Sequence, residues 1–288
     1  PVTVDKDGNP ASALGLGLAY LGDGNALLYS GRYRWFSRDY GKTWSDTVAI
    51  AQTSDEKYWA MWCSPLVERD HKTRKVIRIA ETGYAWFKPP EVTHAHQQGY
   101  IRFSTDEGKT WGKSIKVPEW ERVSEVALLR ADNGDLLGAC RTDIPHWMEV
   151  KGLVFSPSLN DGYEGLGVSV SKDDGLTWST VRKLYDYGRH HPSLLMLPNQ
   201  NIVMTYVVRA GYVDDKNGFP QFGIEAVISH DNGKTWDLDH RYVLHTWVGN
   251  RKGKRDHYAS PYCASLSLLP DGSIITVFGT GYRSQFGL

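Results

Sequence analysis

The sequence is poor in cysteine, has no excess of charge of either sign and contains no long apolar run. Its 288 residues include three cysteines, Cys63, Cys140 and Cys263, with no CxxC pair, so neither a disulfide framework nor a zinc site is indicated. We expect these cysteines to be small packing residues near hairpins. The 33 basic and 33 acidic residues cancel, which argues against nucleic acid as a partner. No run approaches the roughly 20 apolar residues that span a membrane, so no membrane partner is expected.

One eight-residue phrase, Ser-x-Asp-x-Gly-x-Thr-Trp, occurs four times. Its copies begin at Ser37, Ser104, Ser171 and Ser229, with spacings of 67, 67 and 58 residues, and such a period indicates an array of similar units. Each residue type suits a tight turn between strands. The Asp accepts hydrogen bonds from backbone N–H groups, the Gly supplies a positive φ, and the Trp offers an apolar face to a neighbouring unit. We therefore expect these aspartates to be structural and not catalytic.

A second element recurs between the phrases. Short apolar runs flank turn dipeptides such as Asp23-Gly24, Asn133-Gly134 and Asp271-Gly272, and this pattern is the strongest local indication of a β-hairpin. Each unit is thus a hairpin followed by a second hairpin that the eight-residue phrase closes. Four antiparallel strands per unit predict an all-β fold, with each unit one blade of a β-propeller. Complete units are expected over residues 14–50, 62–118, 123–183 and 190–246, and a half unit begins at residue 262.

The phrase is the Asp-box, and the chain resembles the Asp-box (BNR-repeat) proteins, of which sialidases are the best known. The resemblance implies a sialidase-type β-propeller with six four-stranded blades, of which about four and a half are visible here. We therefore expect residues 1–288 to form a single propeller domain that is incomplete at one or both ends, with a closed five-bladed ring as the alternative. It further implies a secreted or periplasmic glycosidase that needs no cofactor.

The resemblance also assigns candidate site residues. Glu125 and Arg141 enter and leave one hairpin, like the sialidase glutamate that polarises a tyrosine nucleophile and one of three arginines that bind the sialic acid carboxylate. Tyr262, just before the hairpin of a late unit, is the candidate nucleophile, and Tyr258 is its competitor. The chemistry is consistent, because a guanidinium matches a carboxylate through two parallel hydrogen bonds.

Two further arginines and a histidine pair complete the candidate site. Arg32 and Arg209 leave their hairpins at what we take to be the same place as Arg141, so the three would converge on the propeller axis. His190 and His191 enter one of these hairpins, and neighbours on a strand point to opposite faces. One imidazole would then face the axis, where it could bind a sugar or act as a general base. No convergent ligand set is visible, so no metal site is predicted.

Two parts of the sialidase pattern are missing. The N-terminal Phe/Tyr-Arg-Ile-Pro phrase, which carries the first arginine of the sialidase triad, is absent. The sialidase general acid is an Asp on a loop before the first Asp-box, for which this chain has no room, and Asp55 is a possible substitute. Aromatic-rich segments around Trp59, Trp86 and Trp147 suit either stacking on sugar rings or packing between blades.

The first hypothesis is therefore a sialidase-like exo-glycoside hydrolase that acts on sialic acid or other acidic glycans. The alternatives are a non-catalytic glycan-binding propeller, and a polysaccharide lyase in which His190 or His191 is the base. The sequence does not indicate an oligomeric state.

Overall fold

The computed structural model describes residues 17–30, 33–55, 57, 59–88, 95–150, 161–249 and 262–280. Regular structure in these ranges is almost entirely β. The short helix α1 (His146–Val150) and the 3-10 helix η1 (Asp161–Tyr163) are the helical segments there. None of the described helices has the length and apolar character needed to cross a membrane.

The strands form four antiparallel four-stranded sheets and one hairpin. Blade 1 comprises β1 (Gly17–Gly22), β2 (Asn25–Ser30), β3 (Tyr33–Ser37) and β4 (Val48–Ala49). Blade 2 comprises β5 (Leu66–Arg69), β6 (Val76–Phe87), β7 (His96–Ser104) and β8 (Ile115–Glu121). Blade 3 comprises β9 (Val123–Arg130), β10 (Leu136–Thr142), β11 (Gly165–Ser171) and β12 (Arg182–Tyr185). Blade 4 comprises β13 (Arg189–Met196), β14 (Ile202–Val208), β15 (Gln221–Ser229) and β16 (Tyr242–Val248). The hairpin comprises β17 (Tyr262–Leu268) and β18 (Ile274–Gly279).

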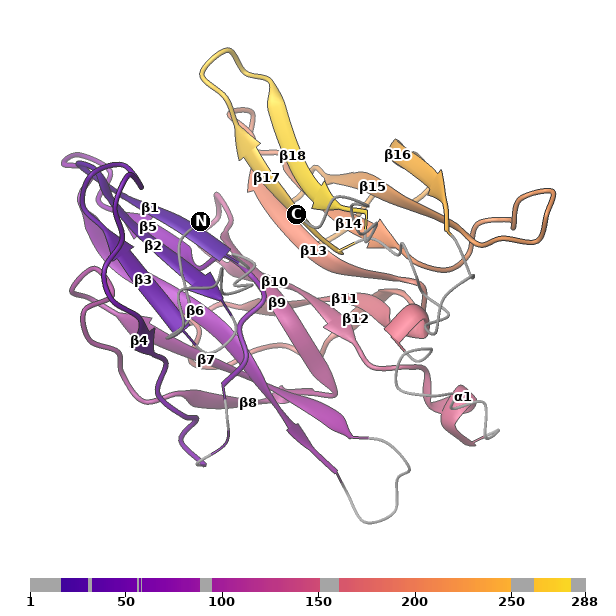
Figure 1. Cartoon of the computed structure of the whole chain (residues 1–288), viewed down its shortest axis with the longest axis horizontal. Coiled ribbons are helices and arrows are strands. Elements are labelled where there is room, and N and C mark those ends of the chain that lie inside the picture. Colours follow the sequence, from indigo (N-terminus) through magenta and orange to yellow (C-terminus); the bar gives the residue numbers. More distant parts are fainter. Residues whose placement is uncertain are drawn as a thin grey trace, which may run out of the picture.

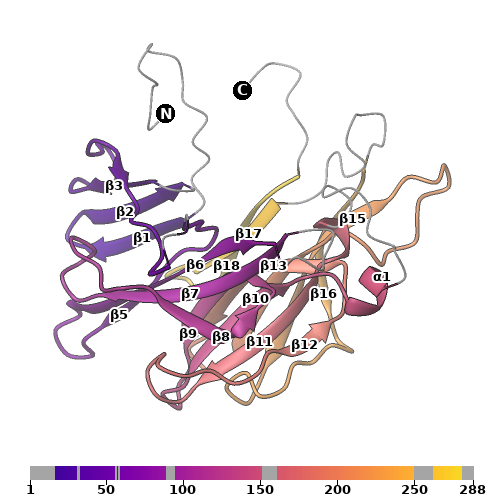
Figure 2. The same cartoon turned by 90° about the horizontal axis from the view of Figure 1, so that it is seen from below.

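The sheets follow one another in chain order around an arc, with blade 1 and the β17–β18 hairpin at its two ends (Figure 1). Figure 2 shows the same succession from the indigo first blade to the orange fourth. The first strands of successive sheets are neighbours in space, β5 beside β9, β9 beside β13 and β13 beside β17. The predicted all-β propeller of four-stranded antiparallel blades is confirmed, as are four complete blades and a half.

Each Asp-box forms the turn between the third and fourth strands of its blade, as predicted. In blade 2 the Asp106 carboxylate accepts hydrogen bonds from the Ser104 hydroxyl at 2.8 Å and from the Thr110 hydroxyl at 2.6 Å. The Thr110 backbone N–H donates to the same carboxylate, and the Gly108 N–H donates to Ser104 Oγ. The same Ser–Asp and Thr–Asp bonds recur in the other three boxes. The Ser, Asp and Thr side chains of the phrase therefore hydrogen-bond within their own turn.

The Asp-boxes also join each blade to the one before it. A Cβ added to Gly108 would lie 2.8 Å from Leu27 of blade 1, and one added to Gly175 would lie 2.8 Å from Phe103 of blade 2. The Trp178 ring packs 4.6 Å from the Trp120 ring of blade 2. Buried apolar clusters therefore lie between successive blades and hold their first strands in fixed positions.

The cysteine prediction is confirmed where the structure describes the side chains. Cys140 is buried, and burial raises the pKa of its thiol to about 12. Cys63 is half-buried. No disulfide joins Cys63 and Cys140, and the side chain of Cys263 lies outside the described residues.

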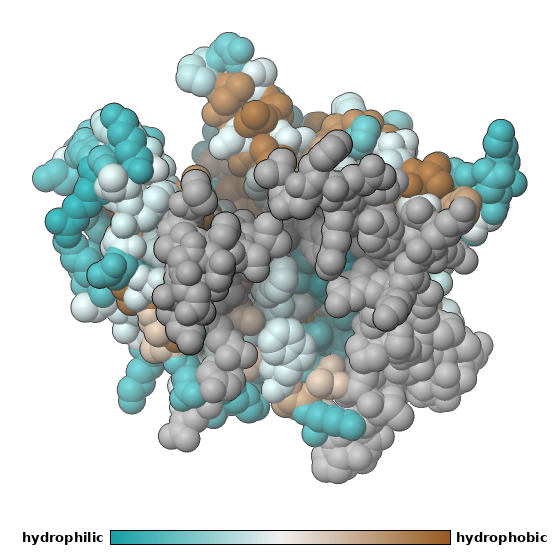
Figure 3. All heavy atoms as spheres, in the orientation of Figure 1, coloured by the Kyte–Doolittle hydropathy of each residue, from teal (hydrophilic) through white to brown (hydrophobic). Residues whose placement is uncertain are grey.

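Apolar side chains are exposed on the β17–β18 hairpin, where brown atoms gather at the top of Figure 3. Ile274, Ile275 and Val277 are all more than two-fifths exposed. None of the described residues covers this face of the hairpin.

Candidate functional site

The candidate site lies where β9 and β13, the first strands of blades 3 and 4, run beside each other. Both strands carry a β-bulge at the same place. The register of β10 against β9 shifts between Ala139 and Arg141, opposite Glu125. The register of β13 against β14 shifts between His190 and Ser193. The bulged residues Glu125 and His191 have φ values of 50° and 52°, a left-handed conformation that is costly for a residue with a side chain. Bulges re-aim side chains, and these two aim Glu125 and His191 at each other.

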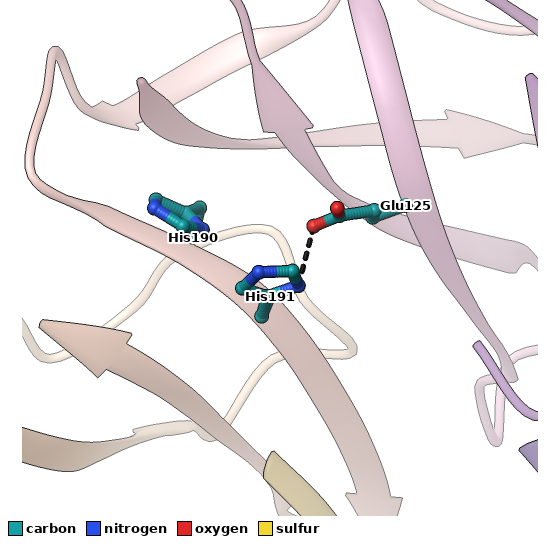
Figure 4. Close-up of side chains that lie close together, drawn as sticks. All are labelled: Glu125, His190 and His191. Carbon is teal, nitrogen blue, oxygen red and sulfur yellow. Dashed lines mark ion pairs between the residues drawn. The ribbon is translucent and has the colours of Figure 1, made fainter. Parts of the chain in front are cut away.

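Glu125 and His191 form a buried ion pair (Figure 4). His191 Nδ1 lies 2.5 Å from Glu125 Oε2, and the two side chains are 4% and 3% exposed. His191 Nδ1 faces the carboxylate, and Nε2 lies on the far side of the ring. Arg209 Nη2 lies 3.4 Å from that Nε2. A carboxylate that fixes the tautomer and orientation of an imidazole in this way is a frequent arrangement in catalytic sites.

Arg141 connects two buried carboxylates. Its Nη1 donates to Glu125 Oε1 at 2.8 Å, and its Nε donates to Glu164 Oε2. Glu164 directly precedes β11, and Leu166, two residues further on, pairs with Arg141 across the sheet. At least two of the five guanidinium N–H donors therefore bind protein carboxylates. Arg141 thus holds both carboxylates in position and adds a positive charge to the site.

The two carboxyl groups titrate in very different ranges. Burial favours the neutral form of both, but Arg141 and His191 outweigh it at Glu125 and lower its pKa to about 2. At Glu164 burial prevails over Arg141, and with the nearby Asp143 it raises the pKa to about 7. Glu125 is thus a permanent anion at neutral pH, whereas Glu164 can carry a proton. Carboxyl groups whose surroundings separate their pKa values in this way are suited to different catalytic roles.

The histidine pair does not follow the alternation expected on a strand. His190 and His191 are both buried, and their ring centroids lie 4.7 Å apart. The prediction that they point to opposite faces is wrong, because the bulge at His191 turns both imidazoles towards Glu125. Burial, Arg141 and His191 lower the pKa of His190 well below its ordinary value, so its ring is neutral at neutral pH.

The predicted equivalence of Arg141 and Arg209 is wrong by two residues. Ser124, directly before the bulged residue of β9, pairs with Arg141. His190, at the same place in β13, pairs with Val207 and not with Arg209. Arg209 lies two residues beyond, after the end of β14, yet it is 5% exposed and its guanidinium still reaches His191. The arginines meet at the site through different backbone positions.

The remaining predicted residues are only partly described. Arg32 and Tyr258 lie outside the described residues. Tyr262 is the first residue of β17, where its backbone pairs with Gly279, and its side chain is not described. Because β17 runs beside β13, the strand that carries His191, Tyr262 begins a strand adjacent to the site.

Asp55, the substitute acid considered from the sequence, belongs to a different environment. Its carboxylate accepts hydrogen bonds from the Thr53 hydroxyl at 2.6 Å and from the Tyr100 hydroxyl at 2.8 Å. Burial acts to raise the pKa of Asp55, but these two hydrogen bonds outweigh it and lower the pKa. Asp55 is therefore ionised at neutral pH and is unsuited to donate a proton.

Tyr84 and Asp143 belong to the same site; Tyr84 lies in one of the aromatic-rich segments noted in the sequence, whereas nothing in the sequence singled out Asp143. Tyr84 is 4% exposed, and burial together with the charge of Glu125 raises its pKa well above the ordinary value. Asp143 accepts a hydrogen bond from Arg122 Nε at 3.2 Å and lies 3.6 Å from His96 Nδ1. Asp143 thereby adds negative charge beside Glu164.

The aromatic segments divide into two kinds. Trp59 is buried and stacks on the Arg102 guanidinium at 4.5 Å, so it packs the blades and cannot meet a ligand. Trp86 is 51% exposed, and its ring lies 4.9 Å from that of Tyr84. Trp147, on α1, is 47% exposed. Trp86 therefore extends from the site to the solvent, where a sugar ring could stack on it.

Glu125, His190 and His191 are also a possible metal-ligand group, since their ligand atoms lie within 4.8 Å of one another. A cation there would compete with Arg141 for the Glu125 carboxylate and with the Nδ1–H of His191. Two guanidinium groups beside the ligands oppose a further positive charge. The arrangement favours an ion-pair network over a metal site.

Comparisons with known proteins agree with the fold. The BNR/Asp-box repeat family matches residues 227–238, the fourth box. No curated protein sequence matches the chain. A protein of unknown function from Dyadobacter fermentans has a similar structure, with 17% identity, a TM-score of 0.60 and coverage of 94% of this chain and 76% of that one. An α-L-arabinanase from Penicillium chrysogenum, solved with arabinobiose, gives 18% identity, a TM-score of 0.58 and coverage of 93% and 77%. A sialidase from Streptococcus pneumoniae gives 14% identity, a TM-score of 0.55 and coverage of 90% and 33%.

These findings confirm the resemblance to Asp-box (BNR-repeat) proteins. At such identities the likeness establishes the propeller fold and leaves the chemistry to the site residues.

Proposed function

We propose that the protein is a glycoside hydrolase that acts on an acidic glycan at the Glu125 site. The observation that carries the proposal is the pair of buried carboxyl groups on one guanidinium, Glu125 with a pKa of about 2 and Glu164 with a pKa of about 7. Glycosidases use such a pair, one member protonated and the other ionised, on either side of the glycosidic bond.

In this mechanism Glu164 is the general acid. Its proton passes to the glycosidic oxygen as the bond from that oxygen to the anomeric carbon breaks. Tyr262 is the nucleophile implied by the sialidase resemblance, an accepted exception to the carboxylate nucleophile of most retaining glycosidases. Its phenol oxygen bonds to the anomeric carbon as the phenol proton passes to Glu125, whose negative charge also stabilises the positive charge that develops on the sugar. Water then attacks the anomeric carbon and gives its proton to Glu164, and the bond to Tyr262 breaks as the phenol regains its proton from Glu125.

An acidic substrate is proposed because two cationic groups converge here. Arg209 and Arg141 are both buried, and Glu125 and Glu164 raise the pKa of Arg141 against the effect of burial, so it stays charged. The positive charge of these two guanidinium groups would attract a substrate carboxylate. More specifically, we propose that the acidic sugar is sialic acid. We also propose a secreted or periplasmic location, which would give the protein access to such glycans.

The test is hydrolysis of methylumbelliferyl glycosides of sialic acid, glucuronic acid and arabinofuranose. We expect turnover of an acidic conjugate, a loss of at least about a hundredfold in Glu164→Gln, and a fall in wild-type turnover as the pH rises through about 7. Asp55→Asn is the matched control, because it removes the other candidate acid outside the site. Wild-type activity in Glu164→Gln, or loss of activity in Asp55→Asn alone, would contradict the assignment. Turnover of arabinofuranoside alone would refute the acidic substrate.

A second candidate is a polysaccharide lyase, and the Glu125–His191 ion pair specifically favours it. When its imidazole is unprotonated, His191 can take the proton at C5 of a uronate while Arg209 neutralises the sugar carboxylate. A C4–C5 double bond then forms as the C4–O glycosidic bond breaks and the leaving oxygen takes up a proton from water. This reaction gives an unsaturated uronate that absorbs in the ultraviolet, which hydrolysis does not. Binding of glycans without either product would indicate the non-catalytic propeller.

A further inference from the structure

A hollow lined by residues of the first two blades lies apart from this chemistry. A cavity of about 1030 Å³ opens between the Asp-box of blade 1 and the Asp-box of blade 2. We call it the box groove; its lining includes Arg34, Trp44, Arg102 and Trp111. Glu125, Arg141 and Glu164 do not line it. The box groove is therefore distinct from the candidate catalytic site.

The groove exists because blade 1 ends in a short outer strand. β4 has two residues, whereas β8, its counterpart in blade 2, has seven. The Asp-box tryptophans of later blades, Trp178 and Trp236, are 5% and 8% exposed. Trp44 and Trp111 are only half-buried. The Trp44 indole is thus partly exposed in the groove, beside the half-buried Trp111.

The floor of the groove carries more positive charge than its protein partners neutralise. Arg34 and Arg102 are 3% and 2% exposed, and both pair with the single carboxylate of Glu81. The Trp111 ring stacks on both guanidinium groups, at 4.5 Å and 5.3 Å. Nε and Nη1 of Arg34 have no hydrogen-bond partner among the described residues. Buried, unsatisfied cationic donors are costly, and an anion in the groove would offset that cost.

The rim adds charge of the same sign. Arg38, Lys109 and Lys113 line the groove and are exposed, and Glu107 is the one acidic residue in its described lining. Five cationic side chains therefore face one acidic side chain, in a protein whose formal net charge is zero. Such local concentration attracts anionic ligands at a distance.

We propose that the box groove is a second binding site, for a segment of an acidic polysaccharide that carries carboxylate or sulfate groups. A sugar ring would lie on the Trp44 face, and the anionic groups would pair with the rim cations above the Arg34 floor. A cavity of this size accommodates a few sugar units. The site would hold a polymer and need not contribute to hydrolysis, so it goes beyond the proposed function.

The test is affinity electrophoresis in gels that contain polygalacturonate, dextran sulfate or neutral dextran. The variant is Lys109→Glu with Lys113→Glu, which changes the rim and leaves the buried floor intact. The matched control is Lys234→Glu with Lys216→Glu, because Lys234 occupies in the fourth Asp-box the position of Lys109 in the second. Trp44→Leu and Arg34→Met test the stacking face and the floor. All proteins also carry Glu125→Gln, so that turnover at the other site cannot alter the polymer.

We expect the two acidic polymers, or one of them, to retard the parent protein while neutral dextran does not. The rim variant should bind about tenfold more weakly and the control variant should match its parent. A preference for polygalacturonate or dextran sulfate identifies the anionic group. Equal retardation of rim and control variants would overturn the proposal, as would equally strong binding of duplex DNA, which would indicate simple charge attraction. Loss of hydrolysis in the Glu125 background leaves these outcomes unchanged, so the two proposals fail separately.

Discussion

Replacing Glu164 by Gln should change how the stability of the protein depends on pH. Burial raises the pKa of Glu164 from 4.5 to about 7, so the folded state binds this proton more tightly than the unfolded state. At about 1.4 kcal/mol per pH unit, the rise corresponds to about 3 kcal/mol. The contribution is fully present below about pH 4.5 and is lost as the pH rises through about 7. Glu164→Gln cannot ionise and should not show this loss.

Glu125, in the same ion cluster, makes the stability depend on pH in the opposite direction. Its pKa is lowered from 4.5 to about 2, so its ionised form stabilises the fold. That contribution, also about 3 kcal/mol, is present above about pH 4.5 and is lost as the pH falls towards 2. The two groups together predict that this cluster is most stabilising near pH 4.5, with a decline on either side. Glu125→Gln should remove only the decline in stability below about pH 4.5.

Urea unfolding of wild type and Glu164→Gln at several pH values between about 4.5 and 8 measures the effect. The variant also loses its charged contact with Arg141, so the informative quantity is the difference between the two unfolding free energies as a function of pH. We expect that difference to shift by about 3 kcal/mol in favour of the variant across the range. Parallel curves would refute the reasoning and would place Glu164 in a solvated environment with an ordinary pKa.

Four further outcomes are expected. Glu125→Gln should lower the unfolding free energy by about 3 kcal/mol at neutral pH, measured by urea titration, because it leaves buried cations unpaired. Asp106→Ala should destabilise the protein by about 1–2 kcal/mol with unchanged turnover per folded molecule, because its bonds lie within a turn. Gly83→Ala should destabilise by at least about 2 kcal/mol in thermal unfolding, because its Cβ would lie 2.2 Å from Trp59. Cys140 should resist thiol reagents in the native protein, detected by peptide mapping after labelling, because its thiol is buried with a pKa of about 12.

The fold could be predicted from the sequence because each Asp-box contains the residues that form its turn. Asp106 finds all its hydrogen-bond donors within four residues, and Gly108 supplies the positive φ between them. Such local interactions repeat wherever the phrase repeats, so the blades could be counted in advance. Predicted and observed blade limits accordingly agree to within a few residues.

The site was harder to predict because its contacts depend on strand register. Glu164 meets Arg141 only because Leu166 pairs with Arg141 across the sheet, and a sequence does not give that pairing. The positions of Arg141 and Arg209 looked alike when counted along the chain and differ by two residues when counted along the ladder. Long-range pairing therefore limited the prediction of the residues that meet Arg141.

The β-bulges at Glu125 and His191 explain why chemistry gathers between blades 3 and 4. A regular strand would have separated His190 from His191 and pointed only one of them at the axis. A left-handed residue inside a strand costs free energy, and equivalent positions in two blades both accept that cost. The Glu125–His191 contact depends on both bulges, and it brings a carboxylate of one blade onto an imidazole of the next. Strain repeated at equivalent positions, where it gathers charged groups, is better explained by a functional requirement than by the packing of the propeller.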